Sequence, residues 1–450
     1  MPLTAALFLS VYILLAASSV FYHPIFGVLG YVYVYLGFSR NSWWGSVLYS
    51  YCSDYSLIMA ACIAVGFVLH QQKLQGTHGT MSHRGKLFVF FIMILCVSLM
   101  FAPAISPDSW YTFTKMLKVF VFVFLFSKIV DRLDFYHWLI VCFAVLGLML
   151  GYYAYTAPPW MFTTGRLNLL GNADFSNSNT LGNLFLVLLC LSGVQIFQRR
   201  RFLEKAVYAV ASTFLCNGIV LCRSRGVFLS AILTGATSVL FAPKKIRGKL
   251  IVGALAGTLM FFTLVDPAFM ARMSTIDNYE QDTSSTSRLA IWKASAEMLL
   301  DHPFGVGIGN FKYFIGNYDP QVARRDSHNT FVRCYGELGV LGLIAFLSLY
   351  VSSFYQLARI RREVTGHDIE YEISLYCMSL FYALVASLLA GMFSTVLYIE
   401  FFWWLLILPS CLEVAVHHQL YQSETAIEQS KHLVKPIFEQ ENWGSESISQ

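Results

Sequence analysis

Charged residues are scarce in this 450-residue chain: they make up 13% of it, against 56% hydrophobic and 16% aromatic residues. Soluble domains usually carry about 25% charged residues, so an ordinary soluble protein is excluded. Apolar runs of about 17–25 residues recur along the chain, which favours spanning helices over a β-barrel. The net charge of +5 is small, and the basic residues are concentrated in a few loops. It therefore indicates membrane orientation rather than nucleic-acid binding.

Several motifs that would indicate a particular chemistry are also missing. The ten cysteines lie almost entirely in apolar runs and none form a CxxC pair, which predicts small buried hydrophobic residues. The chain has no phosphate-binding GxxxxGK[ST], no nucleophile elbow and no metal-ligand spacing, so we expect no metal and no cofactor. The stretch GVGIGN at 305–310 fails the GxGxxG pattern and is predicted to be a turn.

The apolar runs predict an all-α polytopic membrane protein with about 12–13 transmembrane helices. The N-terminus lacks a basic n-region and is interpreted as a retained first span, although AASS weakly resembles a cleavage site. The first two runs could instead form one re-entrant unit. The candidate spans are 3–20, 22–38, 52–70, 87–104, 110–127, 135–155, 179–197, 205–222, 226–241, 250–267, 332–356, 371–394 and 398–416.

Four short basic loops fall on the same side of the predicted spans, so that side is predicted to be cytoplasmic. Their residues are Lys73, Arg84, Lys86, Arg199, Arg200, Arg201, Lys244, Lys245, Arg247, Lys249, Arg359, Arg361 and Arg362. The N-terminus is then outside and the C-terminus inside. We expect a transmembrane domain over 1–417, one large periplasmic loop at 268–331, and a polar, loosely ordered cytoplasmic tail at 418–450.

The long loop (268–331) contains a predicted helix. The stretch TSSTSRLAIWKASAEMLLDHP offers Ser and Thr caps, and Pro303 ends it. Its apolar face is predicted to consist of Leu289, Trp292, Ala296, Leu299 and Leu300. This pattern is typical of an amphipathic helix on a membrane surface.

Arginines near the periplasmic ends of the spans are candidates for anion binding. Arg223 and Arg225, in CRSRGVF, lie where the positive-inside rule disfavours arginine, and a guanidinium matches phosphate oxygens bidentately. Snorkelling at a helix end is the simpler alternative. Arg288, at the start of the loop helix, is a further candidate or an ordinary solvated residue. Arg166, in an Asn-rich loop, could contact a sugar or phosphate, although a structural role is favoured.

His328 opens the stretch SHNTFVRCYGELGVLG, at the start of a predicted span. Asp326 and Ser327 offer oxygens that could cap this helix, which would free the imidazole. A neutral histidine can accept a proton from an attacking hydroxyl, although capping or packing is the commoner role of a histidine at a helix start.

Deeper in the same span, Glu337 is expected to pair with Arg333, because either charge alone is costly in a membrane. Gly336, Gly339 and Gly342 recur every three residues and predict close packing of a neighbouring helix.

These residues resemble the O-antigen ligase-like superfamily, which includes lipid A core–O-antigen ligases, O-antigen polymerases and bacterial protein O-oligosaccharyltransferases. His328 and Asn329, nine residues, then Gly339 and Gly342 reproduce its HNx9GxxG signature. The stretch SRG (224–226) resembles its arginine motif, and SRLAIWKASAEMLLDHPFGVGIGNF (287–311), with Trp292, resembles its run through the periplasmic loop. HPIFGVLGYVYVYL and GRLNLLGN resemble the exosortase-associated branch.

The resemblance implies a glycosyltransferase of the bacterial inner membrane whose active site faces the periplasm. The donor would be a glycan on a polyprenyl (undecaprenyl) diphosphate, and the acceptor a hydroxyl of a lipid, a protein or a glycan. By this resemblance His328 would activate the acceptor, and Arg225 and Arg288 would bind the donor diphosphate. Supporting residues would be Arg223, Asn329, Arg166, Trp292 and Glu337.

Two alternatives remain open from the sequence. A polymerase of O-antigen or exopolysaccharide would share the donor chemistry and differ in its glycan acceptor. A transporter of polysaccharide or lipid would share the many spans, but transporters favour internal repeats and ionisable groups near the bilayer midplane. Here the strongest polar groups lie at the predicted periplasmic boundary, and no repeat is visible.

Overall fold

The computed structural model describes residues 2–441, except 39, 43, 75–82, 243, 266, 268 and 271–282. The described chain is almost entirely helical. The α-helices are α1 (Leu3–Phe21), α2 (Ile25–Gly37), α3 (Gly45–Tyr51), α4 (Tyr55–Leu69), α5 (His83–Met100), α6 (Pro107–Ile129), α7 (Leu133–Tyr155), α8 (Ser178–Gly193), α9 (Phe202–Cys222), α10 (Arg225–Leu240), α11 (Lys244–Leu264), α13 (Thr283–Asp301), α14 (Phe311–Phe314), α15 (Thr330–Glu363), α16 (Glu370–Gly391) and α17 (Glu400–Glu441).

Short elements complete the described chain. The 3-10 turns are η1 (Gln71–Lys73), η3 (Pro159–Met161), η4 (Ala173–Phe175), η5 (Val194–Phe197), η6 (Ile315–Asn317) and η7 (Pro320–Val322). A two-stranded antiparallel hairpin pairs β1 (Phe162–Thr163) with β2 (Arg166–Leu167). Positive φ angles at Thr164 and Gly165 form the tight turn between its strands.

The predicted fold class, an all-α polytopic membrane protein, is confirmed. Each predicted span coincides with a helix or, at 52–70, with the second part of a broken helix pair. Within the described residues, eight helices are long and apolar enough to cross a membrane, or nine if α3 and α4, bent by 66°, are one span. Two further apolar helices, α2 and α10, are shorter.

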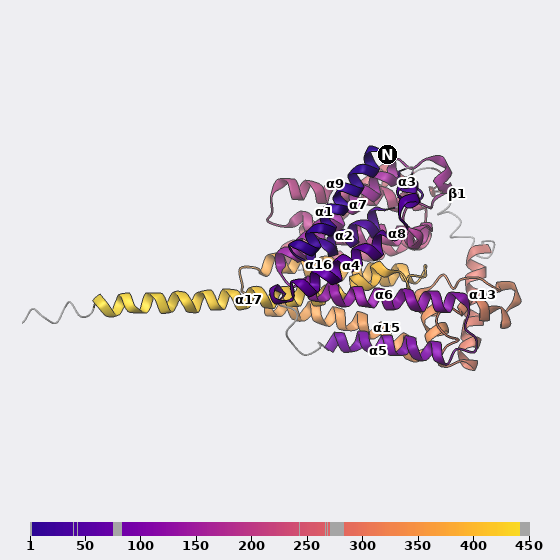
Figure 1. Cartoon of the computed structure of the whole chain (residues 1–450). Coiled ribbons are helices and arrows are strands. Elements are labelled where there is room, and N and C mark those ends of the chain that lie inside the picture. Colours follow the sequence, from indigo (N-terminus) through magenta and orange to yellow (C-terminus); the bar gives the residue numbers. More distant parts are fainter. Residues whose placement is uncertain are drawn as a thin grey trace, which may run out of the picture.

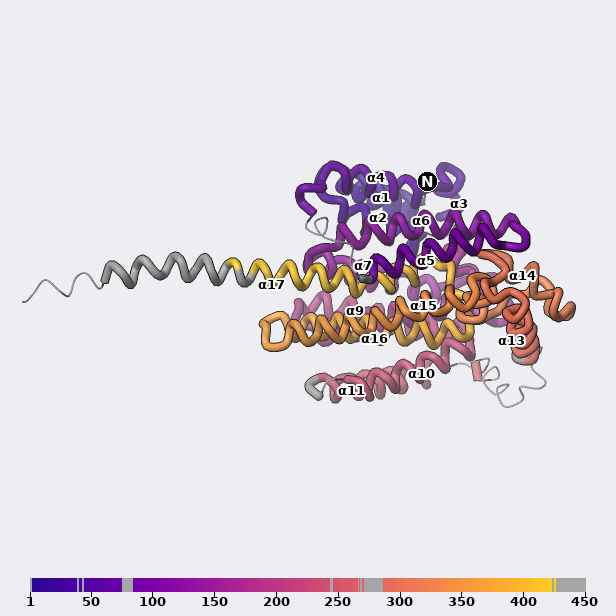
Figure 2. Tube along the Cα trace, turned by 90° about the horizontal axis from the view of Figure 1, so that it is seen from below, coloured from indigo at the N-terminus to yellow at the C-terminus, as the bar shows by residue number. Residues whose placement is uncertain are grey.

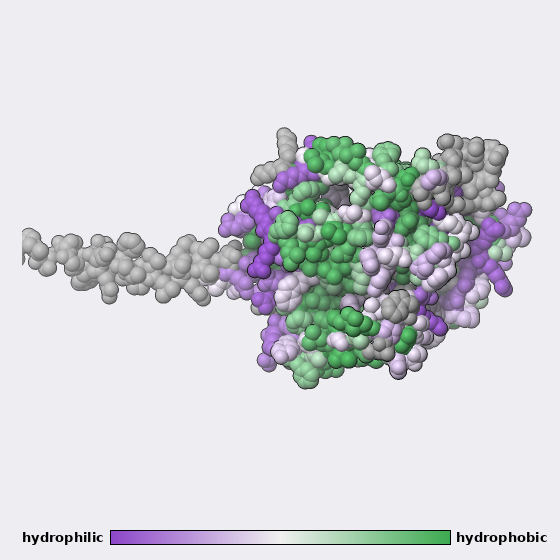
Figure 3. All heavy atoms as spheres, turned by 90° about the horizontal axis from the view of Figure 1, so that it is seen from above, coloured by the Kyte–Doolittle hydropathy of each residue, from purple (hydrophilic) through white to green (hydrophobic). Residues whose placement is uncertain are grey.

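The helices form an elongated bundle with two different ends (Figures 1 and 2). At the end that we name the loop end, α13 and α14 lie together (Figure 2). At the opposite end, which we name the basic end, α17 projects from the bundle beside the 364–369 turn between α15 and α16. Hydrophobic side chains cover much of the middle of the face shown in Figure 3, and hydrophilic residues gather toward both ends. This distribution suits a protein that spans a bilayer between its two ends.

The centre of the bundle is built on α17. Trp403 and Trp404 are fully buried there. The Trp403 ring centroid lies 4.9 Å from those of Phe91 on α5 and Phe120 on α6, and Trp404 lies 4.8 Å from Tyr35 on α2. Large aromatic side chains bury much apolar surface and pack edge to face, so α17 holds α2, α5 and α6 of the N-terminal half of the chain together.

Two features of the basic end differ from the sequence-based expectation. Arg84, expected in a loop, is buried, and its guanidinium donates to Ser353 Oγ at 2.8 Å and to Ser410 Oγ at 3.1 Å. It therefore ties α5 to α15 and α17. The chain after residue 418, expected to be loosely ordered, continues α17 as helix to Glu441.

The predicted helix in the long loop is present as α13, and the side that it packs against the protein differs from the predicted apolar face. Leu289 and Leu300 are 56% and 83% exposed, whereas Ile291, Ala294 and Met298 are buried. The buried residues pack against loop and α15 side chains, namely Phe311, Ile315, Val322 and Val332. The long loop thus has a small core of its own. Its choice of face could not be read from α13 alone, because apolar residues occur all round that helix.

Candidate functional site

A kink in α15 receives the GVGIGN turn of the long loop. Gly339 interrupts the helix with φ 70° and ψ −172°. The turn runs against this break: Val306 N donates to Gly336 O at 2.9 Å, and Gly307 N donates to Glu337 O at 3.0 Å. A Cβ on Gly305 would lie 2.3 Å from Glu337 O, and one on Gly339 would lie 2.4 Å from Pro303 O. Only glycine lets the two backbones approach this closely.

We expect Gly339→Ala to destabilise the protein by about 2–5 kcal/mol, because it combines a left-handed backbone with steric overlap. Gly366 is the matched control: it has φ 86°, and a Cβ added to it would meet nothing within 4 Å. Gly366→Ala should therefore cost only about 1 kcal/mol of backbone strain. Thermal unfolding of the detergent-purified proteins measures both. Equal losses would contradict a close approach at Gly339.

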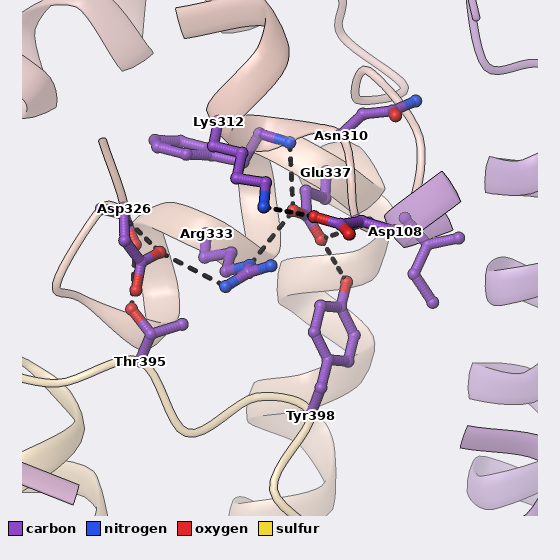
Figure 4. A network of polar contacts seen from close by, with 12 residues as sticks. Asp108, Asn310, Lys312, Asp326, Arg333, Glu337, Thr395 and Tyr398 are labelled. Carbon is purple, nitrogen blue, oxygen red and sulfur yellow. Dashed lines mark hydrogen bonds and ion pairs between the residues drawn. The ribbon is translucent and has the colours of Figure 1, made fainter. Parts of the chain in front are cut away.

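Glu337 is the centre of a buried polar network at this kink (Figure 4). Its side chain is 0% exposed. Its Oε2 accepts hydrogen bonds from Gly309 N at 2.9 Å and Tyr398 Oη at 2.6 Å, and its Oε1 accepts from Phe311 N at 3.1 Å. Arg333 Nε lies 3.1 Å from Oε1, so the predicted pair of Arg333 and Glu337 is confirmed. One carboxylate therefore binds α15, the long loop and the segment before α17 together.

The same network extends to the residues that flank His328. The Arg333 guanidinium lies between Glu337 and Asp326, and its Nη1 is 3.3 Å from Asp326 Oδ1 (Figure 4). The α15 N-cap is Asn329, whose Oδ1 accepts from Phe331 N at 2.9 Å and Val332 N at 3.2 Å. Asp326 and Ser327, the expected caps, have other partners. Asn329 directly precedes Thr330, the first residue of α15, so its side chain is closer to these amides.

His328 lies in the connection between these anchors. It is half-buried, with a left-handed φ of 50°. The preceding residue is fixed from two sides: Trp292 Nε1 donates to Ser327 O at 3.2 Å, and the hydroxyls of Ser327 and Thr395 are 3.3 Å apart. A non-glycine residue in this conformation is uncommon and persists where the surroundings determine it. The backbone therefore sets the direction of the imidazole.

Charged side chains of both signs act on His328. Burial lowers the pKa of the imidazole below its usual value; the Asp326 carboxylate opposes this effect, and the positive charges of Arg288, Arg166 and Arg325 add to it. The imidazole is therefore neutral near pH 7 and can accept a proton. The predicted base and two of the predicted arginines, Arg288 and Arg166, are close enough to interact electrostatically.

Arg166 and Arg223 join the hairpin to the loop-end turn between α9 and α10. Arg166 donates to Cys222 O at 3.3 Å and to Asn179 Oδ1 at 2.5 Å, and Arg223 donates to Gly165 O. Ser224 Oγ donates to the same Asn179 oxygen at 2.8 Å. Both arginines thus have structural contacts as well as charge.

Arg225 is the first residue of α10, directly after the N-cap Ser224. A helix N-terminus presents backbone N–H groups and a partial positive charge, which favour anions. The next residue, Gly226, lies against Phe393, since a Cβ on it would be 2.3 Å from Phe393 Cβ. From the other side, Thr330 Oγ1 donates to Ser394 O at 2.7 Å. The segment 393–395 therefore connects the starts of α10 and α15.

Three parts of this site were not predicted from the sequence. Tyr398 and Ser98 touch Glu337 from elements far away in the chain, with Ser98 Oγ donating to Glu337 O at 3.1 Å. The close neighbours of Gly336 are Met298 of α13 and Phe311, so the long loop supplies the close packing predicted for the glycines. The alternating glycines of 305–310 are the only sequence signal for this docking, and they were interpreted as a turn. Among the described residues, no group of three His, Cys, Asp or Glu side chains could hold a metal ion.

Comparison with known protein families finds one match in this chain. Residues 209–347 match the family model described as O-Antigen ligase. The match runs from α9 through the long loop to the middle of α15, so it includes Arg223, Arg225, Arg288 and His328. No curated protein matches the chain.

Proposed function

Because this multi-pass membrane protein carries an O-antigen ligase domain over residues 209–347, we propose that it transfers a glycan from a polyprenyl diphosphate to an acceptor hydroxyl. The domain supports the general class of the enzyme, a membrane glycosyltransferase of the O-antigen ligase and polymerase type. We further propose that the reaction takes place at the loop end of the bundle, on the periplasmic face of the bacterial inner membrane.

The observation that carries the proposal is the setting of His328. A neutral, half-buried imidazole is held by backbone contacts within the electrostatic reach of Arg288 and Arg166. A general base for a hydroxyl must be unprotonated, and a diphosphate donor needs fixed positive charge nearby. Both requirements meet at the start of α15.

The proposed reaction is one displacement. The imidazole of His328 takes the proton of the acceptor hydroxyl while the acceptor oxygen bonds to the anomeric carbon of the donor sugar. The bond between that carbon and the diphosphate oxygen breaks, and the polyprenyl diphosphate leaves with its electron pair. Arg225 and Arg288 stabilise the growing negative charge and act as an electrostatic clamp without a metal. Attack opposite the diphosphate inverts the anomeric centre.

We expect Arg225→Gln and Arg288→Gln each to lower kcat/KM for the lipid-diphosphate donor by about 10²–10³-fold, the usual effect of losing one charge-stabilising donor. Arg324→Gln is the control, because Arg324 is exposed on the same loop. The measurement is transfer at varied donor concentration. Unchanged kinetics in both variants would contradict a diphosphate at this site.

Ligase and polymerase differ in the acceptor, and a deletion strain distinguishes them. Loss of glycan from lipid A core or protein, with polymer still present on the carrier, identifies a ligase. Loss of chain length identifies a polymerase. We propose the ligase as the primary function, with the same base and the same arginines serving either acceptor.

A further inference from the structure

A cavity at the basic end lies far along the bundle from His328. It is formed between the first residue after α10, the second half of α15 and the middle of α16, and its volume is about 160 Å³. This volume is smaller than that of a typical small-molecule site, about 300–1,000 Å³, and is enough for part of an acyl chain. Its lining residues are Phe241, Phe354, Leu357, Ala358, Arg361, Cys377, Met378, Phe381 and Tyr382.

The cavity is apolar apart from one cation. Rings line its walls, with Phe381 5.2 Å from Phe354 and 6.0 Å from Phe241 between ring centroids. The Tyr382 hydroxyl is turned to the protein, since it donates to Ser238 O at 2.9 Å. Such walls suit an acyl chain better than a polar metabolite.

Arg361 is the charged member of this lining, and it is half-buried. Two carboxylates at this end, Glu363 and Glu413, pair with Arg359. Arg359 Nε lies 2.7 Å from Glu363 Oε1, and Arg359 Nη1 lies 3.8 Å from Glu413 Oε1. In the part of the chain that the structure describes, no carboxylate pairs with Arg361. A guanidinium at the end of a membrane helix reaches the interface, where a lipid phosphate can supply its counter-charge.

We propose that this cavity binds an anionic phospholipid from the leaflet at the basic end, with its phosphate on Arg361 and an acyl chain along the aromatic wall. Basic residues at the cytoplasmic ends of membrane helices attract the anionic lipids of that leaflet, and basic pockets between helices bind their headgroups. The turn after Arg361 lies at the end where α17 leaves the bundle, opposite α13 (Figure 2). This lipid is therefore distinct from the glycan donor, and the site does not depend on the proposed function.

Native mass spectrometry of the full chain in detergent, titrated with phosphatidylglycerol, tests the site. Wild-type protein should retain one phosphatidylglycerol more tightly than phosphatidylcholine. Arg361→Gln should weaken this binding about tenfold, the effect of losing one charge-assisted hydrogen bond. Arg362→Gln is the matched control, because Arg362 is adjacent and exposed. Ala358→Trp fills the cavity while keeping Arg361 and should also displace the lipid.

Each outcome decides the proposal. It is overturned if Arg361→Gln binds phosphatidylglycerol as well as wild type, or if Arg362→Gln loses as much. Millimolar inorganic phosphate should not displace the lipid; if phosphate alone competes fully, the site binds phosphate and not phospholipid. Size-exclusion profiles and unfolding temperatures that match wild type establish that the variants are folded.

Discussion

Replacing His328 with Asn should lower the rate of glycan transfer by about 10²–10⁴-fold, the usual contribution of a general base. Asn is a better test of the imidazole than Ala, because it disturbs the backbone less. The φ of His328 is 50°, and Asn tolerates this left-handed conformation better than Ala does. The variant therefore removes the imidazole and leaves the backbone between Ser327 and the α15 cap in place. Transfer is measured with saturating donor in membranes that contain equal amounts of each protein.

Donor binding and membrane abundance should stay unchanged in His328→Asn. The control is His367→Asn, since His367 is exposed in the turn at the basic end. Transfer at the wild-type rate in His328→Asn would show that another group is the base. Lost donor binding in that variant would instead assign His328 to the donor site.

The pH dependence of transfer follows from the same environment. Burial and the nearby arginines lower the pKa of His328, so the imidazole stays unprotonated at and somewhat below the ordinary histidine value. The rate should therefore be constant from pH 8 down to about 6.5 and fall only at lower pH.

Replacing Glu337 with Gln should cost about 3 kcal/mol of stability, the scale expected when one partner of a buried ion pair is removed. The two side chains have nearly the same volume, so no cavity forms. The cause is polar: Glu337 accepts from two backbone amides and from Tyr398, and it neutralises Arg333. In the Gln variant an N–H₂ group faces one of these hydrogen-bond donors, so one donor loses its acceptor. Asp326 is then the one carboxylate, of the two described here, that still pairs with Arg333.

We expect two measurements to show the loss. The unfolding temperature in detergent should fall, and limited proteolysis should cut the long loop faster, since Glu337 binds Gly309 and Phe311 to α15. Glu297→Gln on α13 is the control, because Glu297 is exposed. Wild-type stability together with wild-type proteolysis in Glu337→Gln would mean that the network is not what holds the loop.

Much of the fold was predictable because membrane spans are encoded as long apolar runs. Those runs located the helices, and the cost of an unpaired charge in a membrane predicted the ion pair of Arg333 and Glu337. The composition of the long loop also predicted α13. These features can be predicted from short segments of sequence, because hydrophobic periodicity indicates helices and the cost of a buried charge predicts its pairing.

Contacts between distant segments could not be predicted. Tyr398 lies 61 residues from Glu337 along the chain, and nothing in either segment indicates their hydrogen bond. The buried face of α13 depended on the side chains of the long loop, and the cap of α15 was Asn329 rather than its neighbours. The GVGIGN stretch was correctly interpreted as a turn, but its docking required the break at Gly339, which only the folded backbone displays.

Reconstitution of the purified chain tests the central claim most directly. Vesicles would contain polyprenyl diphosphate carrying a labelled glycan, and lipid A core, protein and glycan acceptors would be supplied in separate reactions. We predict that the label moves to one acceptor class with inverted anomeric configuration, that polyprenyl diphosphate appears in equal amount, and that chelators have no effect. Label that stays on the carrier while the carrier crosses the bilayer would contradict this account and identify a transporter.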